Sequence, residues 1–231
     1  MYKAIIFDLD NTLLNYTHSE LDCMKRTLHQ HDLLRDEQDE WEIFWEAYSR
    51  HNSRYWLDFV NKIGPLQSIE EVLISSFRDS LNRDQGTHER LSATYWHLFC
   101  HTCHFEPGAE ELLQTVRSQY KLGIISNGIG EAQRQRLQAG KVYELFHSIV
   151  VSDEAGIRKP RQEIFELSLN ELGLMHEEVL FVGDSITDDY HGALNAGIDF
   201  CYYNRHRQEL SLAQQPKYVI HELQELLRMI R

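Results

Sequence analysis

The chain of 231 residues has little of what marks membrane, nucleic-acid-binding or disulfide-rich proteins. No stretch approaches 18 uncharged apolar residues, and the apolar run between Lys3 and Asp8 is too short for the core of a signal peptide. The four cysteines are scattered, which makes a disulfide framework improbable in such a chain. We therefore expect a soluble, cytoplasmic protein.

Basic residues are also scarce, and no Lys/Arg-rich run occurs. The 23 Lys and Arg stand against 36 Asp and Glu, so the formal net charge is −13. This balance argues against polymeric nucleic acid or an anionic membrane as the main partner. A small phosphorylated substrate remains compatible with it, because one lysine in a pocket can outweigh the global charge locally.

What the sequence does have is a series of short apolar runs, at residues 3–7, 121–126, 148–152, 179–184, 199–204 and 217–220. Their apolar character is continuous, which predicts strands buried on both faces. Amphipathic stretches at 107–120, 159–173 and 221–230 predict helices between and after them. Strands alternating with helices indicate an α/β fold with a Rossmann-like parallel sheet.

The alternation is interrupted once, between the first and the second predicted strand. There the pattern is helical and rich in aromatic residues, with possible capping boxes at Thr17/Glu20 and Ser68/Glu71. Most of the aromatic residues are expected to form a helix-bundle core, and a minority could face a substrate. We predict a catalytic core of residues 1–14 and 106–231 with an inserted all-α cap domain of residues 15–105.

Polar residues follow several of the predicted strands. Ligands of open parallel sheets bind at the carboxyl ends of the strands. The residues expected there are Asp8, Asp10, Ser126, Asn127, Gly128, Asp184 and, ahead of a helix, Lys159. Each type alone has an ordinary interpretation, such as a helix cap, a turn or a surface lysine. Their joint occurrence after successive strands indicates a site.

The charges of this set point to a metal and a phosphoryl group. Several carboxylates in one crevice repel each other unless a cation lies among them, and oxygen ligands of this kind suit Mg²⁺. Lys159 supplies a fixed positive charge for an anion, and Ser126 and Asn127 supply hydrogen-bond donors. A phosphoryl group satisfies both requirements, and an aspartate can serve as its covalent acceptor.

Four segments, in order, resemble the motifs of the haloacid dehalogenase superfamily: "FDLDNTL", "IISNG", "GIRKP" and "VLFVGDSITDDYHGALNAGI". The resemblance covers residues 4–198. It implies that Asp8 is the nucleophile and Asp10 the acid/base. It implies further that Ser126 and Lys159, with Asn127 and Gly128, hold the phosphoryl oxygens, and that the ligands of Mg²⁺ are Asp8, Asp184 and the backbone carbonyl of Asp10.

The fourth motif contains two adjacent aspartates. Their offset from Asp184 resembles the family variant in which the second acidic residue precedes "YHGA". We expect Asp189 to be the additional acidic support, and Asp188 to be a solvated residue at the start of a helix.

Asp10 narrows the reaction, since the dehalogenases of this superfamily lack this aspartate and phosphate-ester cleavage requires a proton donor for the leaving oxygen. The segment from "LGIISNG" to "NELG" resembles bacterial 5′-nucleotidases that favour pyrimidine and noncanonical nucleoside monophosphates. A cap aromatic such as Trp45, Tyr48 or Trp56 could then stack a base.

Alternatives are a sugar-phosphate or phosphoglycolate phosphatase, and a phospho-aspartate signalling module that does not turn over. Receiver domains are about half this length and need neither Asp10 nor a helical insertion. The stretch Cys100 to His104, "CHTCH", has the spacing of a haem attachment or half a zinc site. A helix end beside Pro107 is the favoured interpretation, and the oligomeric state, monomer or dimer, stays open.

Overall fold

A computed structural model describes residues 1–33 and 38–230 of the chain. The chain divides into two compact units, which we call the core unit (residues 1–19 and 100–231) and the helical unit (residues 20–99). Within the described residues, no helix combines the length and the apolar character needed to cross a membrane.

The core unit is built on a six-stranded sheet in which every neighbouring pair is parallel. The order is β3-β2-β1-β4-β5-β6, so β1 lies near the centre, between β2 and β4. The predicted α/β fold and all six predicted strands are confirmed. The strands are β1 (Ala4–Phe7), β2 (Lys121–Ser126), β3 (Ser148–Val151), β4 (Val179–Gly183), β5 (Asp199–Tyr203) and β6 (Tyr218–Ile220).

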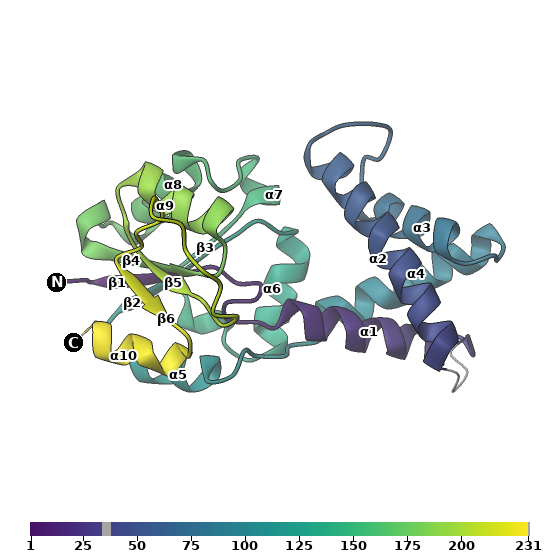
Figure 1. Cartoon of the computed structure of the whole chain (residues 1–231), viewed down its shortest axis with the longest axis horizontal. Coiled ribbons are helices and arrows are strands. Elements are labelled where there is room, and N and C mark those ends of the chain that lie inside the picture. Colours follow the sequence, from purple (N-terminus) through teal and green to yellow (C-terminus); the bar gives the residue numbers. More distant parts are fainter. Residues whose placement is uncertain (34–37, 231) are drawn as a thin grey trace. The chain divides into compact units, whose positions relative to one another are not determined.

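Helices cover both faces of this sheet (Figure 1). Successive side chains of a strand point to opposite faces. Ile5 and Phe7 accordingly pack with α5 (Ala109–Val116), α6 (Gly130–Ala139) and α10 (Leu226–Met229). Ala4 and Ile6 pack with α8 (Gln162–Leu172) and α9 (His191–Ala196). Burial on both faces explains the continuous apolar runs of the sequence.

The core unit also contains several short helices in the segments that connect its strands. Two of the predicted helices, 107–120 and 159–173, are present but shorter, as α5 and α8. The third, 221–230, is wrong as a single helix: a 3-10 turn precedes the four residues of α10, because extended Glu222 delays the helix start. The remaining elements are η1 (Tyr143–Leu145), α7 (Ser152–Ala155), η2 (His176–Glu178), the π-helix η3 (Ile186–Tyr190) and η4 (Leu223–Glu225).

The helical unit contains most of α1 (Tyr16–Gln30) and the helices α2 (Gln38–Val60), α3 (Ile69–Ser80) and α4 (Gln85–Cys100). Its interior is aromatic: the buried rings of Phe44, Tyr48 and Tyr95 surround that of Phe77 with centroids 5.0–6.5 Å away. The predicted aromatic bundle core is confirmed for these residues. The helix end predicted for the stretch Cys100 to His104 is confirmed as well, since α4 ends at Cys100.

Of the two predicted capping boxes, the structure contains half of the one at Ser68 and none of the cap at Thr17. Ser68 Oγ accepts the backbone N–H of Glu71 at 3.2 Å, but the Glu71 carboxylate accepts from Gln67 and not from the cap residue. The Thr17 cap is wrong, because α1 begins at Tyr16 and Asn15 Oδ1 accepts the N–H of His18 at 2.9 Å. Asparagine is as good an N-cap as threonine, and it stands two residues earlier.

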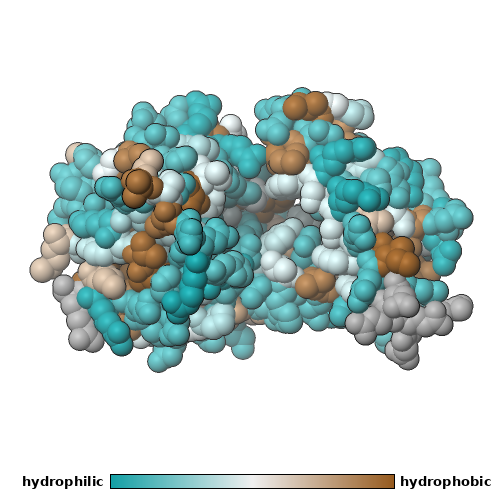
Figure 2. All heavy atoms as spheres, viewed as in Figure 1, coloured by the Kyte–Doolittle hydropathy of each residue, from teal (hydrophilic) through white to brown (hydrophobic). Residues whose placement is uncertain are grey.

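In the view of Figure 2, the surface is mostly hydrophilic, with apolar groups separated by polar ones. Scattered apolar residues are normal for a protein surface. The large exposed ones include Ile43, Leu57, Ile63, Met175, Leu194 and Leu212.

Candidate active site

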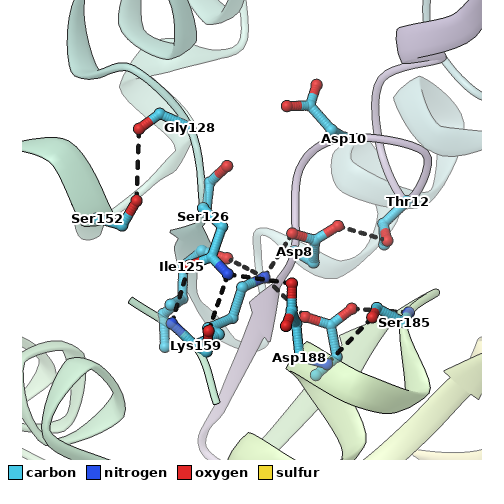
Figure 3. A network of polar contacts seen from close by, with 12 residues as sticks. Asp8, Asp10, Thr12, Ile125, Ser126, Gly128, Ser152, Lys159, Ser185 and Asp188 are labelled. Carbon is cyan, nitrogen blue, oxygen red and sulfur yellow. Dashed lines mark hydrogen bonds and ion pairs between the residues drawn. The ribbon is translucent and has the colours of Figure 1, made fainter. Parts of the chain in front are cut away.

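Asp8 follows β1 directly, at the carboxyl edge of the sheet, and it is 6 % exposed. Its backbone N–H donates to the carbonyl of Val182 on the neighbouring strand, at 2.8 Å. Thr12 Oγ1 donates to one carboxylate oxygen at 2.9 Å, and Lys159 Nζ contacts the other at 2.6 Å (Figure 3). The carboxylate is therefore fixed at a strand end by a neutral donor and a cation.

Lys159 lies in the segment before α8 and is almost fully buried, with 2 % of the residue exposed. Its ammonium donates to Asp8, to Asp189 Oδ1 at 2.7 Å and to the carbonyl of Ile125 at 3.0 Å. These three acceptors match the three protons of an ammonium group. Lys159 thus joins β1, β2 and the segment after β4 at a single point.

Asp189 lies on η3 and is 1 % exposed. Its second oxygen accepts the backbone N–H of Ser185 at 3.0 Å. A Cβ atom placed on Gly183 would lie 2.3 Å from this carboxylate, so only glycine at the end of β4 leaves room for it. π-Helices occur often at functional sites, and here one aims a carboxylate at Lys159.

The pKa values of the buried groups show an excess of negative charge. Burial raises the pKa of Asp8 well above its usual range, Lys159 opposes this, and Asp189 and Asp184 reinforce it. Burial and then Asp189 raise the pKa of Asp184 to about 7. Burial lowers the pKa of Lys159, but Asp189 and Asp8 outweigh that and raise it overall. Lys159 pairs with Asp8 and Asp189, and Lys159 and Arg205 only partly offset the rise in the pKa of Asp184.

A metal ion would balance this charge. Asp8, Asp184 and Asp189 each offer an oxygen, and these atoms lie within 4.8 Å of one another. An all-oxygen donor set of carboxylates is typical of Mg²⁺, Ca²⁺ or Mn²⁺ sites. The cluster could therefore hold a divalent cation. The side chain of Asp10 is not a member of it.

Asp10 instead turns away from the Asp8 and Lys159 network (Figure 3). One of its oxygens accepts from Arg136 Nη1 at 2.6 Å, and the other accepts from Gln133 Nε2 at 2.6 Å. Both partners lie on α6, where Arg136 is 0 % and Gln133 2 % exposed. The two aspartates of the first motif therefore have separate cations.

Ser126 and Asn127 end β2 beside these groups. Ser126 is buried, and its Oγ accepts from Gln133 Nε2 at 2.9 Å. The Asn127 side chain accepts from the backbone N–H of Lys159 at 2.8 Å and donates to its carbonyl at 3.0 Å and to Asp188 Oδ2 at 3.2 Å. The Asn127 side chain therefore links the segments of Lys159 and Asp188. A ligand would then bind Asn127 through its backbone N–H and not through its side chain.

Asp188 lies in the first turn of a helix, as predicted, but it is not merely a solvated residue. It is half-buried, it accepts from Asn127, and its backbone N–H donates to Ser185 Oγ at 3.1 Å. The π-helical turn of η3 brings it to the site together with Asp189. The sequence favoured Asp189 because its five-residue offset from Asp184 resembles a family variant, and that resemblance carries no information about the burial of Asp188.

A cavity of about 150 Å³ opens where these groups meet. The structure brings every predicted site residue to it except Gly128, which lies just beyond β2. The cavity is lined by Asp8, Asp10, Ser126, Asn127, Lys159, Asp184, Ser185, Asp188 and Asp189.

Gln133 and Arg136 are two polar residues at this edge to which the sequence assigned no role. They belong to a "Q-x-x-R-L" run that resembled the nucleotidases, and they stand three positions apart, on one face of a helix. The available signal was their i, i+3 spacing, which places both on the helix face next to the apolar residues Ala132 and Leu137.

The cap aromatics proposed for base stacking differ in exposure. Tyr48 is 0 % exposed and packs among aromatic rings of the helical unit, so it is a core residue and not a stacking surface. Trp45 is partly exposed and stacks on Trp41 and Tyr48, with centroids 5.4 and 6.0 Å away. Trp56 is also partly exposed, and its ring lies 5.9 Å from that of Phe59.

The chain belongs to the haloacid dehalogenase-like hydrolase family, whose model matches residues 5–203. It is 29 % identical to the pyrimidine 5′-nucleotidase YjjG of Escherichia coli K12 over 96 % of both chains. It is 27 % identical to the pyrimidine 5′-nucleotidase PynA of Streptococcus pneumoniae, over 98 % of this chain and 94 % of that protein.

Among solved structures, the magnesium-bound putative HAD-hydrolase YfnB of Bacillus subtilis superposes with a TM-score of 0.78 at 24 % identity. This match covers 100 % of this chain and 99 % of that one. The expected family, the fold class and the enzyme class of a hydrolase in this family are confirmed.

Proposed function

We propose that the chain is a Mg²⁺-dependent phosphomonoester hydrolase that acts as a 5′-nucleotidase on small nucleoside monophosphates, through an aspartyl-phosphate on Asp8. The observation that carries this proposal is the cavity in which Asp8 and Lys159 meet beside further carboxylates. A nucleophile, a fixed cation and a hydroxyl group surround one space, which is what phosphoryl transfer to a carboxylate requires.

Two displacements make up the reaction. An Asp8 oxygen attacks phosphorus, and the bond from phosphorus to the ester oxygen breaks with its electron pair on that oxygen, which takes a proton from Asp10. Water then gives a proton to Asp10 as its oxygen attacks phosphorus, and the bond to Asp8 breaks. Free phosphate and the alcohol leave, and both aspartates return to their starting states.

The surrounding residues bind and orient the phosphoryl group. Ser126 and the backbone N–H groups of Asn127 and Gly128 donate to its oxygens, and Lys159 neutralises them while it restrains Asp8. Asp8, Asp184 and the backbone carbonyl of Asp10 hold Mg²⁺, with Asp189 as acidic support. When bound, the ion neutralises charge on the carboxylates and the phosphoryl oxygens.

The substrate class rests on the two relatives and on the reaction chemistry. Both relatives are named pyrimidine 5′-nucleotidases, and they match nearly the whole chain. A nucleoside leaves as an alkoxide, which is a poor leaving group and needs the acid that Asp10 provides. Trp45 and Trp56 of the helical unit are partly exposed, and we propose them as the aromatic residues that could stack a base.

The test is a panel of phosphate esters incubated with the purified protein and Mg²⁺, with free phosphate as the readout. UMP, CMP and dTMP are expected to be hydrolysed faster than AMP, sugar phosphates or phosphoglycolate. Asp8→Asn is expected to lower kcat at least about 10⁴-fold, and Asp10→Asn roughly 10²- to 10⁴-fold. Asp199→Asn, at the start of β5, is the control for the same change outside the site.

Three results would contradict the proposal in different ways. Activity that survives Asp8→Asn would refute the mechanism. Turnover of a sugar phosphate alone would refute only the substrate class. A stable phosphoprotein without phosphate release would favour a signalling module.

A further inference from the structure

The face of α6 that points to the site carries Gln133 and Arg136, which contact the acid/base and the phosphate-binding serine together. Gln133 Nε2 donates to Asp10 Oδ2 at 2.6 Å and to Ser126 Oγ at 2.9 Å. Arg136 Nη1 donates to Asp10 Oδ1 at 2.6 Å and to Gln133 Oε1 at 2.9 Å. Gln133, Arg136 and Asp10 form a closed ring of hydrogen bonds, and Ser126 is joined to this ring through Gln133.

The donor and acceptor types permit only one orientation of the Gln133 amide. A guanidinium group has donors and no acceptor, so the oxygen of Gln133 must face Arg136. The NH₂ group then faces Asp10 and Ser126 and gives one proton to each. Because Ser126 Oγ accepts from Gln133, its own proton is left to point into the cavity, where the phosphoryl group is expected.

The backbone leaves room for this arrangement. A Cβ atom on Gly128 would lie 2.3 Å from Gln133 Nε2, so a side chain at position 128 would displace the amide. Burial completes the constraint, because Arg136 is 0 % and Gln133 2 % exposed. Burying charged and polar side chains costs solvation free energy, and the hydrogen bonds to Asp10 and Ser126 offset part of this cost.

We propose that Gln133 and Arg136 are positioning residues of this enzyme: they fix the carboxylate of Asp10 and turn the hydroxyl proton of Ser126 toward the phosphoryl group. This inference rests on the proposed function, since it assigns the two residues to the same reaction. Neither residue touches the reacting atoms; both act through Asp10 and Ser126.

Leaving-group dependence tests the proposal. A nucleoside monophosphate needs a proton on its leaving oxygen, whereas p-nitrophenyl phosphate releases a stable phenolate. The ratio kcat/KM reports the steps up to transfer of the phosphoryl group to Asp8. Gln133→Leu is expected to lower kcat/KM about 30-fold for the nucleotide and about threefold for p-nitrophenyl phosphate, because misplacing an acid removes part of its effect.

The matched control is Gln135→Leu, the same change on the same helix at a residue that pairs with Glu131. It is expected to leave kcat/KM for the nucleotide and for p-nitrophenyl phosphate within a factor of about two of wild type, because exposed side-chain pairs contribute little.

If Gln133→Leu does not fold, Gln133→Glu keeps the size of the side chain and removes both donors. Arg136→Lys, which retains a donor, is expected to preserve more of the nucleotide activity than Arg136→Met.

A double-mutant cycle supplies the second readout. Once Asp10→Asn has removed the acid, adding Gln133→Leu should lower nucleotide kcat/KM by less than about threefold, because residues that act as a unit are not additive. Equal losses for both substrates, additive losses in the cycle, or the same loss in Gln135→Leu would overturn the inference while the proposed function stands. A wild-type protein that hydrolyses no phosphate ester would instead refute the proposed function.

Discussion

Lys159 of the core unit and Phe77 of the helical unit are both buried, but their surroundings are opposite in kind. Lys159 contacts two carboxylates and a carbonyl, and each of these ions has been removed from water. Phe77 is surrounded by Phe44, Tyr48 and Tyr95. Buried ion clusters are a poor source of stability, whereas buried rings are a good one. At these two positions, burial serves chemistry in the core unit and packing in the helical unit.

The largest effect is expected where burial serves chemistry. Lys159→Met removes the cation from Asp8 and Asp189, and we expect kcat to fall about 10³-fold, as for the loss of a charge that stabilises a transition state. Removing one partner of a buried pair also destabilises by about 3–5 kcal/mol. Urea denaturation and phosphate release measure the two effects.

Lys217→Met is the matched control, because Lys217 pairs with Asp199 at an exposed site. It should cost at most about 1 kcal/mol of unfolding free energy and leave kcat unchanged. If Lys159→Met kept its activity within a factor of ten, the assignment of Lys159 to the phosphoryl group would be wrong.

Phe77→Ala tests the packing side of the comparison. The ring is 0 % exposed, and we expect its removal to cost about 3–5 kcal/mol of unfolding free energy, because a cavity remains among the neighbouring rings. The kcat for p-nitrophenyl phosphate should change little in protein that is still folded. Thermal melting and kinetics at low temperature measure both, with Phe77→Leu as the conservative variant. A large fall in kcat without loss of stability would break the division between the units.

The pH dependence of the unfolding free energy tests whether the buried carboxylates of the core unit repel each other. The pKa of Asp184 is raised to about 7 by burial and by Asp189. An acid with a raised pKa contributes stability below its unfolded-state pKa, and that stability is lost as the pH rises through the folded-state value. The metal-free protein should therefore lose roughly 3 kcal/mol between about pH 4 and 7 from this group.

Urea denaturation across this range, without and with Mg²⁺, measures the effect. Asp184→Asn should remove much of the slope, and Mg²⁺ should restore stability at pH 8, because a bound cation compensates the ionised carboxylates. Asp199→Asn is the control that keeps the slope. A flat profile in the wild-type protein would show that Asp184 is not held in a negatively charged, buried cluster.

The smallest effect is expected at a helix end. Ser68→Ala removes the acceptor for the backbone N–H of Glu71, and we expect a loss of about 1 kcal/mol of unfolding free energy with no change in kcat. Ser53→Ala, on the exposed face of α2, should instead be neutral or slightly stabilising, because alanine is the better helix former. Equal effects at the two sites would contradict the capping assignment.

Much of the fold was predictable because the six strands are buried on both faces and therefore appear as continuous apolar runs. The short final helix was not, because the extended backbone at Glu222 and the contact of His221 with Glu225 depend on local geometry. The Thr17 cap failed for a similar reason, since a second good cap residue, Asn15, stands close by.

Sequence by itself determined where the reactive groups stand: parallel strands end at one edge, so Asp8, Ser126 and Asp184 had to converge there. Only the tertiary structure decided which side chains meet at that edge. Arg136 lies 126 residues from Asp10 in the chain, and from α6 its Nη1 reaches Asp10 Oδ1 at 2.6 Å. Asp188 enters through a π-helical turn, and Tyr48 is enclosed by rings from three helices. These contacts depend on rotamers and on packing across elements, which periodicity along one segment does not encode.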